Sequence, residues 1–220
     1  KTATQVCFSV QDLRTTLLAI SPDLTKVALL RNKSMILIHS TIADDEEPDE
    51  LNLNPVSSSQ ESEASSPEKD DGSQFETNIA KFASFSPDST RLLVSCNSGF
   101  FALIDFKTEY ETSSEDLIEP LGSDITAACF LPDNRHIALG TSDGIVRVLK
   151  LPVRTDRTTQ IETVRHQKLH SDAPHILVSS SDGGRLASYS NDGSICIWYL
   201  KADSIVMVYP NRPITNVESN

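Results

Sequence analysis

Residues 169–200, which read LHSDAPHILVSSSDGGRLASYSNDGSICIWYL, contain the pattern that decides the fold. Three short apolar runs are separated by two turns, one with Asp182 and the other with Asp192 and Gly193. Runs of this length, with Asp and Gly between them, are typical of antiparallel strands joined by tight turns. The stretch therefore predicts a unit of strand, turn, strand, turn and strand.

The same layout occurs three more times towards the N-terminus. An aspartate in the first turn marks each copy: Asp23, Asp88, Asp133 and Asp182. Eleven residues later each copy has a small residue in its second turn: Ser34, Gly99, Gly144 and Gly193. Sixteen residues after the marker the third strand ends: His39, Ile104, Leu149 and Trp198. Because the internal spacing is the same in all four copies, the chain is built from repeats.

The spacing between the copies indicates the architecture. The markers are 45 residues apart from Asp88 to Asp133, 49 from Asp133 to Asp182, and 65 from Asp23 to Asp88. A period of about 40 to 45 residues with several strands per unit is the signature of a β-propeller blade. The fourth strands are expected from IETVRHQKL and SIVMVYP, and helical spacing is absent. We therefore predict an all-β propeller segment with blades near residues 12–40, 77–110, 122–152 and 168–202.

The longer first interval contains an acidic segment. Asp44 to Asp71 holds eleven acidic side chains and one lysine, and so accounts for ten of the twelve net negative charges of the chain. A stretch with so few large apolar residues cannot offset its ordering entropy, which predicts a disordered insertion over residues 41–76. It is either a solubilising loop or a regulated docking segment, because Ser58 and Ser65 each stand three residues before a glutamate, as acidophilic kinases prefer.

The last copy resembles a blade of the WD-repeat family. Such a blade has a histidine near its start, Ser or Thr on its second strand, Asp in the next turn and Trp at the end of the third strand. Here His170, Ser188 or Ser190, Asp192 and Trp198 stand at these positions. The resemblance implies a structural role, in which Trp198, Ser188, His170 and Asp192 form a buried hydrogen-bonded chain.

The same residue types also raise the alternative of a Ser-His-Asp nucleophilic triad. The sequence contains no G-x-S-x-G elbow and no obvious oxyanion loop, and a tryptophan partner would occupy the hydroxyl that a nucleophile must expose. Two family positions differ, with Leu169 in place of Gly and Tyr199 in place of Asp. We therefore predict no catalytic residues, no cofactor and no small-molecule substrate.

Other classes of site are not indicated by the sequence. The four cysteines are widely spaced without a CxxC pair, which predicts no metal site. No apolar run approaches the roughly 18 residues of a membrane helix, so no membrane association is expected. The chain begins without a methionine, and residues 211–220 resemble the start of a further blade. We expect it to be part of a larger propeller.

The function is predicted from a second, narrower resemblance. Three blades, roughly Thr77 to Val217, look like the second propeller of cirhin-type proteins, WD-repeat subunits of the small-subunit processome. The resemblance implies a non-enzymatic scaffold in pre-ribosomal RNA processing, with protein partners and a nucleolar or nuclear location. The alternative is a peptide-binding propeller, acting as an adaptor or a ubiquitin-ligase substrate receptor, in the cytoplasm.

One charge feature fits an RNA partner. Basic residues gather from Arg147 to His170, from the end of the third predicted blade to the start of the fourth: Arg147, Lys150, Arg154, Arg157, Arg165 and Lys168. Only two acidic residues accompany them in this stretch, so it is locally positive and suited to contact RNA phosphates. The alternative is a solvated connection between blades, and no aromatic residue is present to stack on bases.

Overall fold

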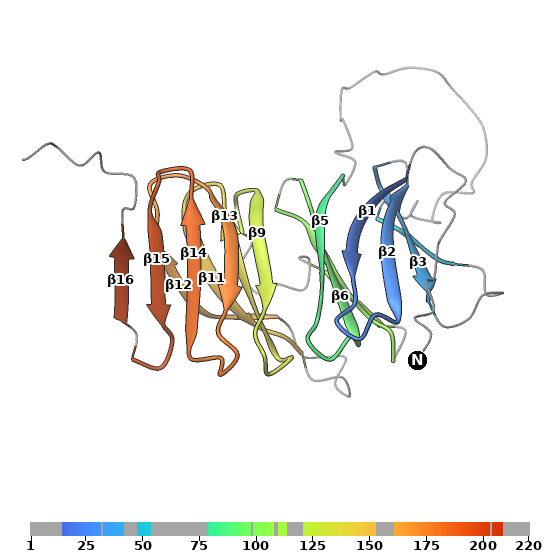
Figure 1. Cartoon of the computed structure of the whole chain (residues 1–220). Helices are drawn as coiled ribbons and strands as arrows, with labels where there is room; N and C mark the ends of the chain where they lie inside the picture. The colour runs from blue at the N-terminus through green and yellow to red at the C-terminus, as the bar shows by residue number, and fades with distance from the viewer. Residues whose placement is uncertain are drawn as a thin grey trace, which may run out of the picture.

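The computed structural model describes residues 15–31, 33–41, 48–53, 79–97, 99–107, 110–113, 121–152, 161–202 and 204–208. These residues form four antiparallel sheets, each with four strands that pair in chain order. Figure 1 shows the sheets following one another from the blue N-terminal strands to the orange C-terminal ones. The prediction of an all-β fold built from blades is therefore confirmed.

We name the sheets blades 1 to 4. Blade 1 contains β1 (Thr15–Ile20), β2 (Lys26–Arg31), β3 (Met35–Ser40) and β4 (Asp49–Asn52). Blade 2 contains β5 (Ala80–Phe85), β6 (Arg91–Cys96), β7 (Phe101–Asp105) and β8 (Tyr110–Ser113). Blade 3 contains β9 (Ile125–Phe130), β10 (His136–Thr141), β11 (Ile145–Lys150) and β12 (Glu162–Lys168). Blade 4 contains β13 (Pro174–Ser179), β14 (Arg185–Ser190), β15 (Ile195–Tyr199) and β16 (Ser204–Val208).

One part of the predicted disordered insertion is a strand. Residues 49–52 form β4 and pair with β3, from Met35 opposite Asn52 to Ile38 opposite Asp49. The disorder prediction is wrong for these residues, because β4 completes the sheet and the side chain after it, Leu53, is only 4% exposed within the core. Residues 42–47 and 54–76 of the segment, with Ser58 and Ser65, lie outside the described residues.

The marker aspartates close the first turn of every blade. In blade 1, Asp23 Oδ1 accepts hydrogen bonds from Ser21 Oγ at 2.7 Å and from the backbone N–H of Thr25 at 2.9 Å. Ser86 with Asp88 and Ser180 with Asp182 repeat the pair of side chains. The next residue adopts a left-handed backbone with φ between 56° and 63°: Leu24, Ser89, Asn134 and Gly183. This conformation makes the turn tight enough to join neighbouring strands.

The second turn uses glycine in three blades. Gly99, Gly144 and Gly193 have φ values of 74°, 81° and 77°, as their place eleven residues after the marker predicts. Blade 1 differs, because Lys33 rather than Ser34 takes the left-handed conformation, with φ of 67°. The repeat therefore holds in backbone geometry with a shift of one residue in this turn.

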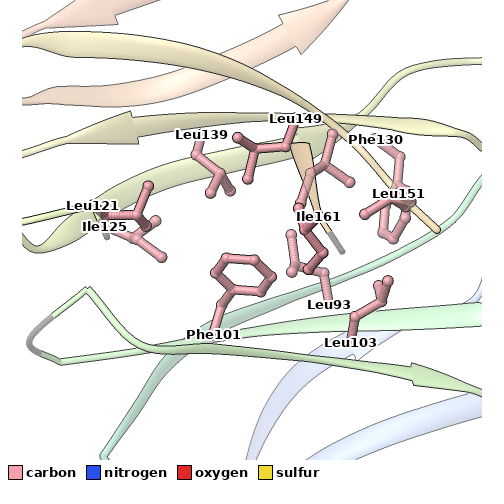
Figure 2. Packing of buried hydrophobic residues seen from close by; sticks show 11 residues of the cluster. Leu93, Phe101, Leu103, Leu121, Ile125, Phe130, Leu139, Leu149, Leu151 and Ile161 are labelled. Atoms are coloured by element: carbon pink, nitrogen blue, oxygen red, sulfur yellow. The ribbon is translucent and has the colours of Figure 1, made fainter. Parts of the chain in front are cut away.

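The hydrophobic core lies between blades rather than within one. The largest side chains in the cluster between blades 2 and 3 come from both sheets, with Phe101 and Leu103 facing Leu139 and Leu149 (Figure 2). A second cluster joins blades 1 and 2, and a third joins blades 3 and 4. Since each sheet is covered by its neighbour on the buried face, stability comes from contacts between successive repeats.

Polar contacts fix the order of the blades at the first turns. The backbone N–H of Asp23 donates to Ser89 Oγ of blade 2 at 3.1 Å, and that of Asp88 donates to Asn134 Oδ1 of blade 3 at 3.2 Å. Strands β1, β5, β9 and β13 lie beside one another in this order. The first strands of all four blades therefore line the same side of the array, as in a propeller.

Candidate functional site

Three of the residues predicted to bond to one another in blade 4, His170, Ser188 and Asp192, meet at one end of this blade. His170 precedes β13, Ser188 lies in β14, Asp192 lies in the turn before β15, and Trp198 lies in β15. His170, Ser188 and Trp198 are each no more than 3% exposed. The turns bring His170 close to Ser188 and Asp192, which follow it by 18 and 22 positions in the sequence.

The imidazole of His170 is bonded at both nitrogens. Its Nε2 lies 2.7 Å from Ser188 Oγ, and its Nδ1 lies 2.7 Å from Ser194 Oγ. Ser194 in turn donates its hydroxyl proton to Asp192 Oδ1 at 2.5 Å, and Asp192 Oδ2 is 3.6 Å from Nδ1. The sequence did not single out Ser194, whose only signal is its place two residues after the aspartate of a turn.

The direction of each bond follows from the protons that are present. Ser194 has one hydroxyl proton and gives it to the carboxylate, so its oxygen must accept from Nδ1–H. Neutral imidazole then has an unprotonated Nε2, which accepts the proton of Ser188. The oxygen of Ser188 keeps capacity to accept the indole N–H of Trp198, and this predicted bond stays a prediction. Ser190 bonds instead to the backbone oxygen of Asp172, so Ser188 is the partner of the histidine.

Burial and hydrogen bonds set the ionisation of this group. Desolvation lowers the pKa of His170 more than the nearby Asp192 carboxylate raises it, so the imidazole is held neutral. Asp192 accepts from the side chain and backbone of Ser194 and from the backbone of Ser171, and these bonds outweigh desolvation and hold its pKa well below the usual range. The site is a neutral histidine linked through a serine to a carboxylate anion.

This geometry serves structure rather than chemistry. Ser188 is 2% exposed, so its hydroxyl cannot reach an external substrate as a nucleophile must. The bonds of His170 join the segment before β13 to β14 and to the turn before β15. In the part of the chain that the structure describes, no group of His, Cys, Asp and Glu is arranged to hold a metal ion. The same residues include no helix long and apolar enough to cross a membrane.

Comparison with known proteins places these repeats in a family. The model of the WD domain, G-beta repeat, matches residues 117–149 and 161–199, which cover most of blades 3 and 4. An uncharacterized WD repeat-containing protein of Acanthamoeba polyphaga mimivirus is 30% identical over 98 residues, 44% of this chain and 70% of the viral protein. The chain belongs to the WD-repeat family. WD-repeat domains typically act as non-enzymatic scaffolds for protein interactions, which is the broad function that membership supports.

Blade 3 has a different set of hydrogen bonds at the place where blade 4 has His170. Leu121 stands twelve residues before the marker of blade 3, where blade 4 has His170. The guanidinium of Arg147 takes over the link, donating to Thr141 Oγ1 at 3.1 Å and to the backbone oxygen of Leu121 at 3.3 Å. Thr141 also donates to Asp143 at 2.6 Å. In blade 3 an arginine therefore replaces the imidazole and links a hydroxyl to the segment before β9.

The structure gives Arg147, one of the cations predicted to contact RNA, a role inside blade 3. Its guanidinium is bonded within the WD repeat, and its contact with RNA stays a prediction. Alternation along a strand does not show which cation is drawn to an internal carbonyl, so the sequence did not indicate these bonds. Arg147 is better counted with Asp143 and Thr141 as part of the structural set.

The remaining basic residues are divided between two sheet faces. Val148 pairs with Arg165, and Lys150 pairs with Glu162 across β11 and β12, so Lys150 and Arg165 share one face. Ile145 pairs with Lys168 on the other face. Lys150 and Lys168 are exposed. Two further members of the predicted set, Arg154 and Arg157, lie outside the described residues.

Proposed function

We propose that this WD-repeat chain is a non-enzymatic scaffold in assembly of the small ribosomal subunit, where it holds protein partners and contacts pre-ribosomal RNA in the nucleolus. The observation that carries the RNA part is the outermost strand of blade 3. Lys168, at the C-terminal end of β12, is exposed on one face of the sheet, and Lys150, at the C-terminal end of the antiparallel β11, is exposed on the other face. Cations on a rim strand can approach a phosphate backbone without entering the core.

The charge distribution supports this proposal. Ten of the twelve net negative charges lie between Asp44 and Asp71, far along the chain from β12. The rest of the chain is close to neutral, so the cations near β12 act in a local field that does not repel RNA. The sequence resemblance of residues 77–217 to cirhin-type proteins gives the cellular context.

The buried hydrogen-bonded group around His170 in blade 4 supports the proposal of a scaffold without catalysis. Its serine, histidine and aspartate are the residue types of a nucleophilic triad, yet Ser188 is enclosed and Asp192 reaches the ring chiefly through Ser194. Every member has a role in closing the repeat. We therefore propose no catalytic residue, cofactor or small-molecule substrate for this chain.

Affinity purification with RNA sequencing tests the proposal. The tagged protein, expressed in nucleated cells, is expected to recover precursor RNA of the small subunit, and recovery should fall as the salt concentration rises. A variant with Lys150→Glu and Lys168→Glu is expected to lose most of this RNA. Lys201→Glu is the matched control, because Lys201 is exposed in a turn of blade 4 and is not part of the cluster.

The alternative function gives a different result in the same experiment. A peptide-binding adaptor or substrate receptor would recover a cytoplasmic set of proteins without precursor RNA. Nuclear protein partners with equal RNA recovery from the Lys150 and Lys168 variant would refute the predicted RNA surface and leave the scaffold. The first outcome would change the class of partner, and the second would reject only the RNA-binding surface.

A further inference from the structure

The first turns of successive blades contact one another, and one position of the repeat decides how they do so. This position directly follows the marker aspartate, and blades 1 to 4 fill it differently: Leu24, Ser89, Asn134 and Gly183. All four residues have the same left-handed backbone, with φ between 56° and 63°, so a side chain at this position leaves the turn in one common direction. Only the serine and the asparagine carry a hydrogen-bond acceptor there.

Both acceptors bind the preceding blade. Ser89 Oγ of blade 2 accepts the backbone N–H of Asp23 in blade 1 at 3.1 Å, and Asn134 Oδ1 of blade 3 accepts that of Asp88 in blade 2 at 3.2 Å. Ser89 is only 4% exposed, so its hydroxyl lies enclosed between the two turns. We call a side chain with this role the inter-blade acceptor. Each one links the first turn of its own blade to the first turn of the blade before it.

Blade 4 has no inter-blade acceptor, because Gly183 stands at this position. A Cβ built on Gly183 would have one neighbour within 4 Å, Pro132 Cδ of blade 3 at 3.6 Å, which is an ordinary contact distance. The glycine therefore lies beside the first turn of blade 3, as the acceptors of blades 2 and 3 lie beside the turns before them, and it has room for a side chain. Among the residues that the structure describes, the backbone N–H of Asp133 has no acceptor.

A second position of the repeat differs at the same junction. Three residues after the marker, blades 1 to 3 have a basic side chain: Lys26, Arg91 and His136. Lys26 Nζ lies 5.5 Å from the centroid of the Phe106 ring in blade 2, and the Arg91 guanidinium donates to a backbone oxygen of blade 3 at 3.2 Å. In blade 3, His136 Nδ1 lies instead 2.6 Å from Asp133 Oδ2 of its own turn. In the described part of the chain, both kinds of contact that link a first turn to the next blade are therefore missing between blades 3 and 4.

We propose that the first turns of blades 3 and 4 open and close independently of each other, whereas those of blades 1, 2 and 3 move together through their inter-blade acceptors. The proposal concerns a conformational property of the fold and does not depend on RNA binding. Its cause is the glycine in blade 4, which leaves the N–H of Asp133 to solvent, since Asp133 is exposed.

Contacts of the innermost strands limit this movement to the turns. Ser179 Oγ in β13 donates to the backbone oxygen of Phe130 in β9 at 3.0 Å. Towards the other end of the same two strands, Thr126 Oγ1 donates to the backbone oxygen of Pro174 at 2.6 Å. Blade 4 therefore stays attached to blade 3 along β9 and β13 while the two first turns separate.

Amide hydrogen exchange, followed residue by residue by NMR in the whole chain, tests the proposal. The N–H groups to compare are those of Asp88 and Asp133, which hold the same place in successive turns and both follow a proline. We expect exchange at Asp133 to be at least about tenfold faster, because only Asp88 must first lose a bond to the next blade. Gly183→Asn supplies the missing acceptor and should slow exchange at Asp133 by about tenfold. Asn134→Gly removes an acceptor and should speed exchange at Asp88 by a similar factor.

The chain offers matched controls for these variants. Asn and Gly both adopt the left-handed backbone readily, so Gly183→Asn and Asn134→Gly should fold. Gly183→Ala adds a side chain without an acceptor and should leave Asp133 exchanging fast. The N–H of Leu139, which is fully buried in β10, reports the unfolding of blade 3 as a whole and serves as the reference in each variant.

Several results would overturn the proposal. One is an equal exchange rate at Asp88 and Asp133 in the unchanged chain. Another is fast exchange at Asp133 in the folded Gly183→Asn variant, because the acceptor would then fail to link the turns. Equal slowing by Gly183→Ala and Gly183→Asn would show that bulk rather than an acceptor closes the turns. A parallel change at Leu139 would assign the effect to the stability of blade 3 as a whole.

Discussion

Replacement of two equivalent glycines by alanine separates the cost of backbone strain from the cost of contact between blades. Gly144 and Gly193 hold the same place in successive repeats, with φ of 81° and 77°. In Gly193→Ala the new methyl group enters open space, so the cost is the left-handed backbone alone, about 1 to 2 kcal/mol. In Gly144→Ala the methyl group would lie 2.2 Å from the backbone oxygen of His170.

The larger cost at Gly144 follows from what must move. The oxygen of Gly144 accepts the N–H groups of Leu169 at 3.1 Å and His170 at 3.2 Å, so relief of the clash weakens both bonds and shifts the imidazole. With about 1 kcal/mol for each weakened bond added to the strain, Gly144→Ala should cost about 3 to 5 kcal/mol.

Urea unfolding provides the assay, with the fluorescence of Trp198 as the signal because it is the only tryptophan of the chain. In thermal unfolding of a chain of this size, each kcal/mol of lost stability lowers the melting temperature by about 2 to 4 °C. Equal losses of stability in the two variants would refute the reasoning, because the difference between them arises only from the packing of blade 4 on blade 3.

Three further predictions concern the hydrogen bonds of His170 and Arg147. In urea unfolding, His170→Phe should cost about 2 kcal/mol because it leaves the Ser188 hydroxyl without its imidazole partner, and adding Ser188→Ala should cost less than the sum of the two single changes; additive losses would contradict the bond. The pKa of folded His170 lies below its unfolded value of 6.5, so the unfolded state binds the extra proton and stability should fall as the pH is lowered from 6.5 through the folded pKa. His170→Phe should flatten this decline in melts between pH 7 and 5, and an unchanged slope would assign it to other groups. Arg147→Lys should lower stability by about 1 kcal/mol in the same assay, since a lysine cannot bridge Thr141 and the oxygen of Leu121 at once, whereas Lys150→Gln, on an exposed side chain, should change it little.

The local sequence was sufficient to predict the strands and turns. The marker aspartates and the glycines eleven residues after them fix tight turns through bonds to residues two or three positions away. Such local contacts do not depend on the rest of the fold. The sequence did not predict β4, because its four residues, DELN, have no apolar alternation and no β-branched residue. They form a strand only because they pair with the open edge of β3.

The candidate site could be predicted in part for the same reason. His170, Ser188 and Asp192 follow a family pattern, but the link between them passes through Ser194, which becomes visible only when the turn before β15 is folded against His170. Arg147 has the sequence signature of a surface cation, and only the position of the Leu121 oxygen draws it into the repeat.

The sequence by itself determined the repeat, its all-β character and the family, because these depend on spacing along the chain. The tertiary structure decided which face of each blade is covered. Side chains alternate in every strand whether or not a neighbour is present, so the pattern of Ala187, Ile195 and Ile197 looks the same as that of Ala138, Val146 and Val148. Only the arrangement of the blades in space shows that the set in blade 3 is buried and the set in blade 4 is partly exposed.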